Sequence, residues 1–238
     1  MPEKIADIYV VGTDTGVGKT VLSLLLMQLF EARGYRPFYL KPLQTGCKDA
    51  YDRDSDAAFV YGHMTSLKNQ DPADSVIYCF RNPKAPFFAA RDEGREIDLS
   101  RIDEFITEKR LHHNPVILEA AGGLLVPVTE ETLMVDTIKK SGARVLLAAR
   151  AGLGTINHTL LSVAALRVRN VEPAGIVFLD AVGTHEDMIA ENREAVQKYS
   201  GIAVAGVIGK VDDFAHTPEE CFSILEFLLQ AKGIPSTR

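Results

Sequence analysis

Residues 12–20, Gly-Thr-Asp-Thr-Gly-Val-Gly-Lys-Thr, have the composition of a phosphate-binding loop. They follow the apolar run Ile-Tyr-Val-Val and precede a segment of helical period, so the glycines would turn the backbone from a strand into a helix. The N–H groups of such a turn point at one anion, and the helix adds its N-terminal partial positive charge. Lys19 would then reach the β- and γ-phosphates, and Thr20 would place its hydroxyl on a magnesium ion. The alternative is a tight turn with an exposed lysine.

The loop is one residue longer than the common pattern G-x-x-x-x-G-K-[ST], because Gly12 lies six positions before Gly18. The extra length carries Asp14 and Thr15 to the mouth of the site, where Thr15 would face a second substrate opposite the γ-phosphate. Min/Par-type ATPases have a second signature lysine five residues before the invariant one, and this chain has Asp14 there. The loop therefore argues against that class of nucleotide switch.

Carboxylates that could hold a metal ion occur in two places. Glu119 ends the apolar run Val-Ile-Leu-Glu, and the carboxyl end of a parallel strand lies at the ligand edge of the sheet. The alternative for Glu119 is a cap on the turn that follows. Asp52, Asp54 and Asp56 lie close together, and the residues alone do not tell which is a ligand, a helix cap or simply solvated.

A second lysine is predicted near the same edge. Lys41 closes the expected strand at 36–41, directly before Pro42. A lysine in this position directs its ammonium group to solvent or to an anion. If Lys41 and Lys19 converge, they would clamp a transferring phosphoryl group and an incoming carboxylate or carbamate. The alternative is a surface lysine.

The elements that must position these residues alternate along the chain. Apolar runs of strand length occur at 7–12, 36–41, 115–123, 143–150, 174–180 and 202–209, and helices are predicted at 20–34, 155–170, 185–200 and 217–233. The strand runs are continuously apolar, which is typical of strands buried on both faces of a parallel sheet. We expect an α/β fold with a doubly wound, mainly parallel sheet and helices on both faces, of the P-loop NTPase type.

Several boundaries follow from local signals. Gly34 should stop the helix at 20–34, and Thr217 should be the N-cap of the helix at 217–233. Residues 42–98 are rich in Asp, Pro and Gly and interrupt the alternation, so they should carry site residues on loops and helices. We expect a single domain over residues 1–238.

The composition excludes several functions. The net charge is −6 and no basic block occurs, so a broad nucleic-acid surface is not expected. Cys47, Cys79 and Cys221 lie far apart in the sequence, and the six histidines show no metal-binding spacing. The first residues lack the apolar core of a signal peptide, and no run approaches the roughly 20 residues of a membrane span. We expect a cytoplasmic protein that binds neither nucleic acid nor a membrane.

Taken together, the motifs resemble the dethiobiotin synthetases, ATP-dependent carboxylases of biotin synthesis. The long loop and four further stretches follow in that family's order and at similar spacing, from about residue 8 to about residue 210. The stretches are Lys-Pro-Leu-Gln-Thr-Gly at 41–46, Ser-Asp-Ala-Ala-Phe at 55–59, Glu-Ala-Ala-Gly-Gly-Leu-Leu-Val-Pro at 119–127 and Gly-Leu-Gly-Thr-Ile-Asn-His-Thr-Leu-Leu-Ser at 152–162.

The resemblance implies a reaction. The substrates are 7,8-diaminopelargonic acid, carbon dioxide and ATP with Mg²⁺. An amine captures carbon dioxide as a carbamate, which attacks the γ-phosphate and gives a mixed carbamic–phosphoric anhydride. The neighbouring amine then closes the ureido ring and expels phosphate. A homodimer is also implied, in which the segment at 152–162 receives the substrate carboxylate from the neighbouring subunit and Asn157 contributes a contact. An ordinary helix N-cap is the alternative for that segment.

The family's site residues carry over by motif. Thr20, Asp56 and Glu119 resemble its magnesium ligands, and Lys19, Lys41 and Thr15 its catalytic groups. The substrate contacts would be Thr15, Lys41, Thr45 and Asn157. The nucleotide contacts would be Gly16, Val17, Gly18, Lys19, Thr20, Val21, Asp56, Glu119, Ala120, Ala121, Gly122, Leu179, Asp180 and Gly209.

Two positions depart from the family pattern. Ala120 replaces a glycine, and a positive φ there would cost of order 1 kcal/mol. Leu179 stands where the family often has an asparagine that reads adenine, and leucine cannot hydrogen-bond a base edge. The sequence therefore does not predict selectivity for adenine, and another nucleoside triphosphate could serve as the substrate.

Two other functions are compatible with the loop. Amidating synthetases of cobalamin-type precursors share the nucleotide-binding core, but they usually carry a glutaminase domain, and this chain shows no cysteine nucleophile for one. A nucleotide-dependent switch ATPase is the second. A synthetase consumes nucleotide only with its diamine and carbon dioxide, whereas a switch hydrolyses it slowly without them.

Overall fold

The computed structural model describes residues 3–230, in which seven strands form one parallel sheet. The strands are β1 Ile8–Gly12, β2 Phe38–Thr45, β3 Val76–Phe80, β4 Val116–Glu119, β5 Arg144–Arg150, β6 Pro173–Asp180 and β7 Val204–Gly209. The α-helices are α1 Lys19–Ala32, α2 Asp56–His63, α3 Pro86–Asp92, α4 Leu99–His112, α5 Met134–Ser141, α6 Thr155–Val168, α7 Glu186–Ser200 and α8 Glu219–Leu225. Short 3-10 helices occupy Thr65–Leu67, Pro72–Ser75, Phe214–His216 and Glu226–Leu229.

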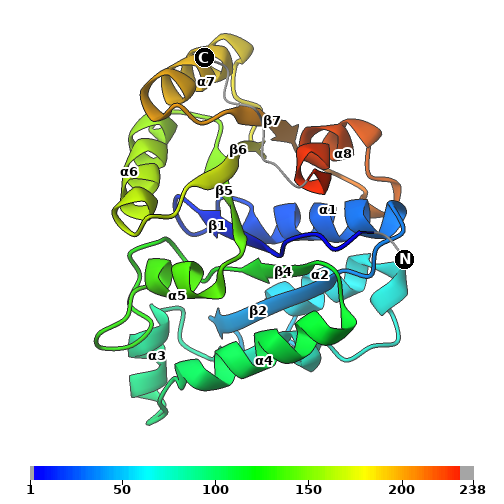
Figure 1. The fold of residues 1–238 in the computed structure, drawn as a ribbon, viewed down its shortest axis with the longest axis vertical. Helices are drawn as coiled ribbons and strands as arrows, with labels where there is room; N and C mark the ends of the chain where they lie inside the picture. The colour runs from blue at the N-terminus through cyan, green and yellow to red at the C-terminus, as the bar shows by residue number, and fades with distance from the viewer. Residues whose placement is uncertain (1–2, 231–238) are drawn as a thin grey trace.

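The strand order, β3-β2-β4-β1-β5-β6-β7, places β1 near the centre of the sheet (Figure 1). The chain winds from β1 toward β3 on one side and later toward β7 on the other. The carboxyl end of β1 therefore lies where the winding reverses, which is the usual ligand site of such a sheet. The predicted α/β architecture with a parallel, doubly wound sheet is confirmed.

Helices cover both faces of the sheet. One buried cluster joins side chains of α1, α2 and α8 to the sheet, and the other joins side chains of α3 to α7 to its opposite face. Successive strand residues alternate between them: Tyr9 packs in the second cluster and Val10 in the first. Burial on both faces explains why the strand runs are continuously apolar. In the described part of the chain, no helix is both long and apolar enough to cross a bilayer.

Two expectations about the β2 region were wrong. β2 does not end at Lys41 but runs through Pro42 to Thr45, and β3 follows as an edge strand that was not predicted. Pro42 is tolerated because its missing N–H faces the β4 side, like the N–H of Phe38 four residues earlier, and the pairing with β4 ends at Leu40. The pairing of β2 with β3 also brings the thiols of Cys47 and Cys79 to 3.1 Å, although both remain free.

The helix boundaries agree with the local signals in one case and not in the other. α1 ends at Ala32, and Gly34 follows with a φ of +80°, as predicted. The N-cap of α8 is Pro218 and not Thr217, whose hydroxyl instead donates to Gln28 Oε1 at 2.7 Å. The predicted continuation of this helix over 231–233 lies outside the described residues.

Candidate active site

The loop between β1 and α1 has the shape that its glycines predict. Gly16 and Gly18 have φ values of +69° and +94°, a region that side chains rarely adopt. A Cβ atom on Gly12 would lie 2.8 Å from Val17 Cγ2, so the loop closes tightly on itself. Val17 is buried and anchors this turn in the core, and α1 begins at Lys19. The amides of the loop and of the first turn of α1 thus surround one concave surface.

The ammonium group of Lys19 lies within this curve. It donates to the carbonyl oxygen of Asp14 at 2.8 Å, and the side chain is only 6% exposed. Burial, and then the charge of Lys41, lower the pKa of Lys19 to about 8. An anion in the loop would oppose both effects.

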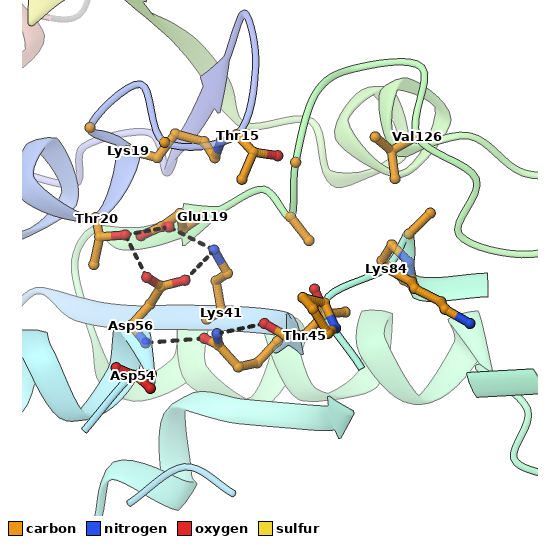
Figure 2. Close-up of a pocket in the computed structure, with 18 of the residues that line it drawn as sticks. Thr15, Lys19, Thr20, Lys41, Thr45, Asp54, Asp56, Lys84, Glu119 and Val126 are labelled. Atoms are coloured by element: carbon orange, nitrogen blue, oxygen red, sulfur yellow. Dashed lines mark hydrogen bonds and ion pairs between the residues drawn. The ribbon is translucent and has the colours of Figure 1, made fainter. Parts of the chain in front are cut away.

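Four of the predicted site residues converge below the loop (Figure 2). The Thr20 hydroxyl lies 2.7 Å from Asp56 Oδ1 and 3.0 Å from Glu119 Oε1. Lys41 Nζ lies 2.7 Å from Asp56 Oδ2 and 2.7 Å from Glu119 Oε1. The first residues of α1 and α2 and the carboxyl end of β4 therefore present three oxygen-bearing side chains around one ammonium group from β2.

The cluster decides between the alternatives left by the sequence. Glu119 is 1% exposed, and its carboxylate contacts side chains of two other elements, α1 and β2, so it is not a turn cap. Lys41 is 4% exposed, so it is not a surface lysine. Among the three aspartates, Asp56 is the one that contacts Thr20 and Lys41. Ser55 is the N-cap of α2, Asp52 accepts from the backbone N–H groups of Lys48 and Asp54, and Asp54 lines the cavity.

The charges of the cluster stabilise one another. Burial alone would lower the pKa of Lys41, but the carboxylates of Glu119 and Asp56 raise it above its ordinary value. Burial alone would raise the pKa of Asp56, but the charge of Lys41 and its hydrogen bond lower it. Lys41 and Asp56 therefore stabilise each other as an ion pair, and Lys19 contributes a second positive charge beside it.

These residues fit a magnesium ion. A hydroxyl and two carboxylates supply the hard oxygen ligands that Mg²⁺ prefers. Residues 3–230 contain no group of three or more His, Cys, Asp or Glu side chains that would enclose a metal without help. In nucleotide sites, Mg²⁺ usually keeps several waters and shares its coordination with substrate phosphates.

A cavity of about 610 Å³ opens above the cluster and continues toward α3 (Figure 2). Most of the predicted residues line it: Thr15, Gly16, Gly18, Lys19, Thr20, Val21, Lys41, Thr45, Asp56, Glu119, Ala121 and Gly122. A second cavity of about 500 Å³ lies between the outer side of the loop and α6. Both cavities share Thr15 and Val126, so they meet at the mouth of the loop.

Ala120 lies behind the cavity and not in its wall. It is 1% exposed, and its carbonyl oxygen accepts from Lys41 Nζ at 3.2 Å. Among residues 3–230, Asn170 is the only non-glycine residue with a positive φ. The backbone strain considered for Ala120 therefore does not arise, because alanine adopts an ordinary φ there.

Three predicted nucleotide contacts lie outside both cavities, at the ends of β6 and β7. Leu179 packs on the loop: a Cβ atom on Gly18 would lie 2.9 Å from Leu179 Cγ. The Asp180 carboxylate accepts from the N–H and the hydroxyl of Thr184, both at 2.8 Å. Gly209 is exposed and is the partner of Asp180 in the β6–β7 register.

Asn157 lies in the first turn of α6, exposed and apart from both cavities. Within this single chain it does not meet the other predicted substrate contacts.

Other residues of the site were not identified from the sequence. Gln44 Oε1 accepts from the N–H of Asp56 at 3.3 Å and so fixes the start of α2, and Tyr39 donates to Glu119. Residues 83–86 form the far wall of the cavity, where Lys84 pairs with Asp92 and points away from the cluster (Figure 2). Of these residues, only Gln44 belongs to one of the motifs quoted from the sequence, so only Gln44 could have been predicted as a site residue.

The parallel sheet, the glycine-rich loop at the end of β1 and the lysine at the start of α1 define a P-loop nucleotide-binding protein. Residues 6–217 match the family described as "AAA domain". Within this class, the chain belongs to the dethiobiotin synthetase family. It is 35% identical over 209 residues to an ATP-dependent dethiobiotin synthetase of an Anaeromyxobacter species, covering 87% of this chain and 92% of that protein. It is 30% identical over 230 residues to one of Bacillus cereus, covering 96% and 93%.

Solved structures support the same fold. A ParA family ATPase of Chlorobium tepidum aligns with a TM-score of 0.56 at 14% identity, over 93% of this chain and 92% of that chain. The MinC:MinD cell division protein complex of Aquifex aeolicus gives a TM-score of 0.61 at 13% identity, over 98% and 99%. At these identities the likeness concerns the fold alone.

Proposed function

We propose that this protein is a dethiobiotin synthetase, which uses ATP and Mg²⁺ to carboxylate 7,8-diaminopelargonic acid with carbon dioxide and to close the ureido ring. The observation that carries the proposal is the convergence of Lys41, Asp56, Glu119 and Thr20 below a phosphate loop, in a cavity large enough for a second substrate. The family membership of the chain supports the same reaction.

The loop binds the nucleotide. Amides of residues 16–21 hold the phosphates, and Lys19 exchanges the carbonyl oxygen of Asp14 for the β- and γ-phosphate oxygens. Thr20, Asp56 and Glu119 would hold the magnesium ion, which when bound neutralises charge on the phosphate oxygens.

Phosphoryl transfer then needs positioning and counter-charge but no protein nucleophile. A carbamate oxygen of the substrate attacks the γ-phosphorus, and the bond from that phosphorus to ADP breaks. The second amine attacks the carbamate carbon, the ureido ring closes and phosphate leaves. Lys41 lies where its ammonium group can stabilise the carbamate and phosphoryl oxygens, opposite Lys19. Thr15 and Thr45 line the cavity and orient the diamine.

The active form is proposed to be a homodimer. Asn157 can contact substrate only if a second subunit brings it there, because it lies outside the cavities of its own chain. Large apolar side chains are exposed on and around α6, namely Leu153, Leu161 and Val168. A protein–protein contact would bury these side chains.

We also propose a cytoplasmic location and a single domain over residues 1–238. Three free cysteines in the described chain are in keeping with a reducing compartment.

The test is product formation. The protein is incubated with diaminopelargonate, ¹³C-bicarbonate and Mg·ATP. The products are then separated, and their masses are measured by mass spectrometry. We expect dethiobiotin that carries one ¹³C atom, together with one ADP per product molecule. A reaction without the diamine is the control. Nucleotide hydrolysis at the same rate with and without the diamine, and no dethiobiotin, would instead indicate a switch ATPase.

A further inference from the structure

Two groups of buried hydroxyl hydrogen bonds meet at Tyr39, one at its backbone carbonyl and one at its side chain. Tyr61 Oη lies 2.8 Å from Ser75 Oγ, and Ser75 Oγ donates to the carbonyl oxygen of Tyr39 at 2.6 Å. Tyr39 Oη then donates to Glu119 Oε2 at 2.9 Å. All four side chains are at most 6% exposed. The mechanism above uses only Glu119.

Tyr39 is built into the same face of the sheet as the cluster. It lies two residues before Lys41 on β2, so both side chains point to the face that α1 and α2 cover. On β4, Glu119 points to this face as well, two residues after Ile117, which is the register partner of Tyr39. The position of Tyr39 is therefore set by strand pairing and not by a mobile loop.

The two oxygens of Glu119 have different partners. Oε1 faces the Thr20 hydroxyl and Lys41 Nζ, on the side of the cavity. Oε2 faces the hydroxyl of Tyr39, a residue that is not part of the cavity lining. A carboxylate that is held at one oxygen cannot rotate freely, so its other oxygen keeps a fixed direction.

We propose that Tyr39 is a positioning residue of the metal·nucleotide site. Its hydroxyl holds Glu119 Oε2, and Oε1 thereby stays directed at Thr20 and the metal that the two residues share. The proposal rests on the proposed function in one respect, namely that Glu119 is a metal ligand.

Tyr39→Phe tests this, because the variant keeps the buried ring and removes only the hydroxyl. Tyr61→Phe is the matched control. It also removes a buried tyrosine hydroxyl on the same face of the sheet, but that hydroxyl contacts Ser75 and not Glu119. Folding of both variants is compared by circular dichroism and thermal unfolding. The readout is Mn²⁺ affinity in the presence of a non-hydrolysable ATP analogue, measured by electron paramagnetic resonance.

Tyr39→Phe is expected to weaken Mn²⁺ binding about 10- to 100-fold, the usual effect of losing a partner of a metal ligand, while Tyr61→Phe stays near wild type. In the catalytic assay, Tyr39→Phe should need more Mg²⁺ for half-maximal rate, and saturating Mg²⁺ should restore most of the rate. The affinity for the ATP analogue in the absence of metal should not change. A general loss of packing would lower this affinity as well, so the measurement separates the two causes.

Glu119→Gln separates the failures. If Glu119→Gln weakens Mn²⁺ binding and Tyr39→Phe does not, the positioning role is wrong and the assigned metal ligand stands. If Glu119→Gln leaves Mn²⁺ binding unchanged, both the ligand assignment and the positioning role are overturned. If Tyr39→Phe is less stable than Tyr61→Phe, the Tyr39→Phe/Glu119→Gln double variant decides whether Tyr39 acts through Glu119. Non-additive effects of the two substitutions on Mn²⁺ affinity support this role, and additive effects overturn it.

Discussion

At the scale of single residues, Lys41 pairs with Asp56 and Glu119 and has a catalytic role in the proposed mechanism. Replacing it with alanine would leave the carboxylates of Asp56 and Glu119 close together without their shared ammonium group. We expect turnover to fall by at least about 100-fold, because a charge directed at the transferring group is lost. The free energy of unfolding should fall by about 3 kcal/mol, since an uncompensated carboxylate stays buried.

Steady-state kinetics and denaturant unfolding of Lys41→Ala measure these two effects. Lys48→Ala is the control, because Lys48 is exposed on the same segment of the chain. A Lys41→Ala variant that turns over near the wild-type rate would exclude the role assigned to Lys41.

Lys19 predicts a pH dependence of nucleotide binding. Its pKa is lowered to about 8 in the free protein, mainly by burial, and bound phosphates would raise it again. Affinity should therefore be full below about pH 8 and fall as the pH rises above it, by at most about tenfold per pH unit, because binding must take up one proton. Calorimetry at pH 9 in two buffers of different ionisation enthalpy measures that proton. Equal heats in both buffers would contradict the prediction, and Lys19→Met should abolish the uptake.

At the scale of secondary-structure elements, the carboxyl end of β6 bears on the choice of base. Leu179 packs on Gly18, and the Asp180 carboxylate is occupied by Thr184. Leucine supplies apolar contact but no hydrogen bond, and apolar contacts discriminate between similar ligands by only about 10- to 200-fold. We expect kcat/KM for ATP to exceed the values for CTP and GTP by no more than that. A preference above about 10⁴-fold would mean that another element reads the base by hydrogen bonds.

Elements with strong local signals were predicted correctly from the sequence. The continuous apolar run of β1, the Gly-Lys-Thr motif and the helical period of α1 are all local, and so is Gly34 after α1. β3 was missed because an edge strand is short and only partly buried, and it lies within a segment rich in turn residues. The predicted end of β2 at Lys41 was wrong because a proline does not end a strand when its missing N–H faces an unpaired side. Beyond Leu40, β2 no longer pairs with β4 but continues to pair with β3 as far as Thr45.

The candidate site residues also differ in how far the sequence predicts them. Lys19, Thr20 and Glu119 could be assigned to the site because each belongs to a motif at the end of a predicted strand or the start of a helix. Choosing Asp56 over its neighbours needed the family resemblance. Tyr39 reaches Glu119 across 80 positions of sequence, and only the strand register brings them together.

At the scale of the whole molecule, the proposed homodimer predicts that one surface change affects both assembly and catalysis. Leu161 is 61% exposed on α6 and borders the second cavity. Leu161→Asp would place a charge in an apolar subunit contact, so the variant should sediment as a monomer and lose turnover, with a raised KM for the diamine. Analytical ultracentrifugation with parallel kinetics measures both. Lys68→Asp, on an exposed turn away from α6, is the control. A Leu161→Asp variant that is dimeric and fully active would contradict the assignment.

The central claim is that the loop and two lysines hold a triphosphate beside the diamine. A crystal structure with a non-hydrolysable ATP analogue, Mg²⁺ and diaminopelargonate tests it most directly. The account predicts the phosphates on the amides of residues 16–21, the terminal phosphate between Lys19 and Lys41, and the diamine next to it near Thr15 and Thr45. A triphosphate bound elsewhere, or a diamine that does not reach the terminal phosphate, would contradict it.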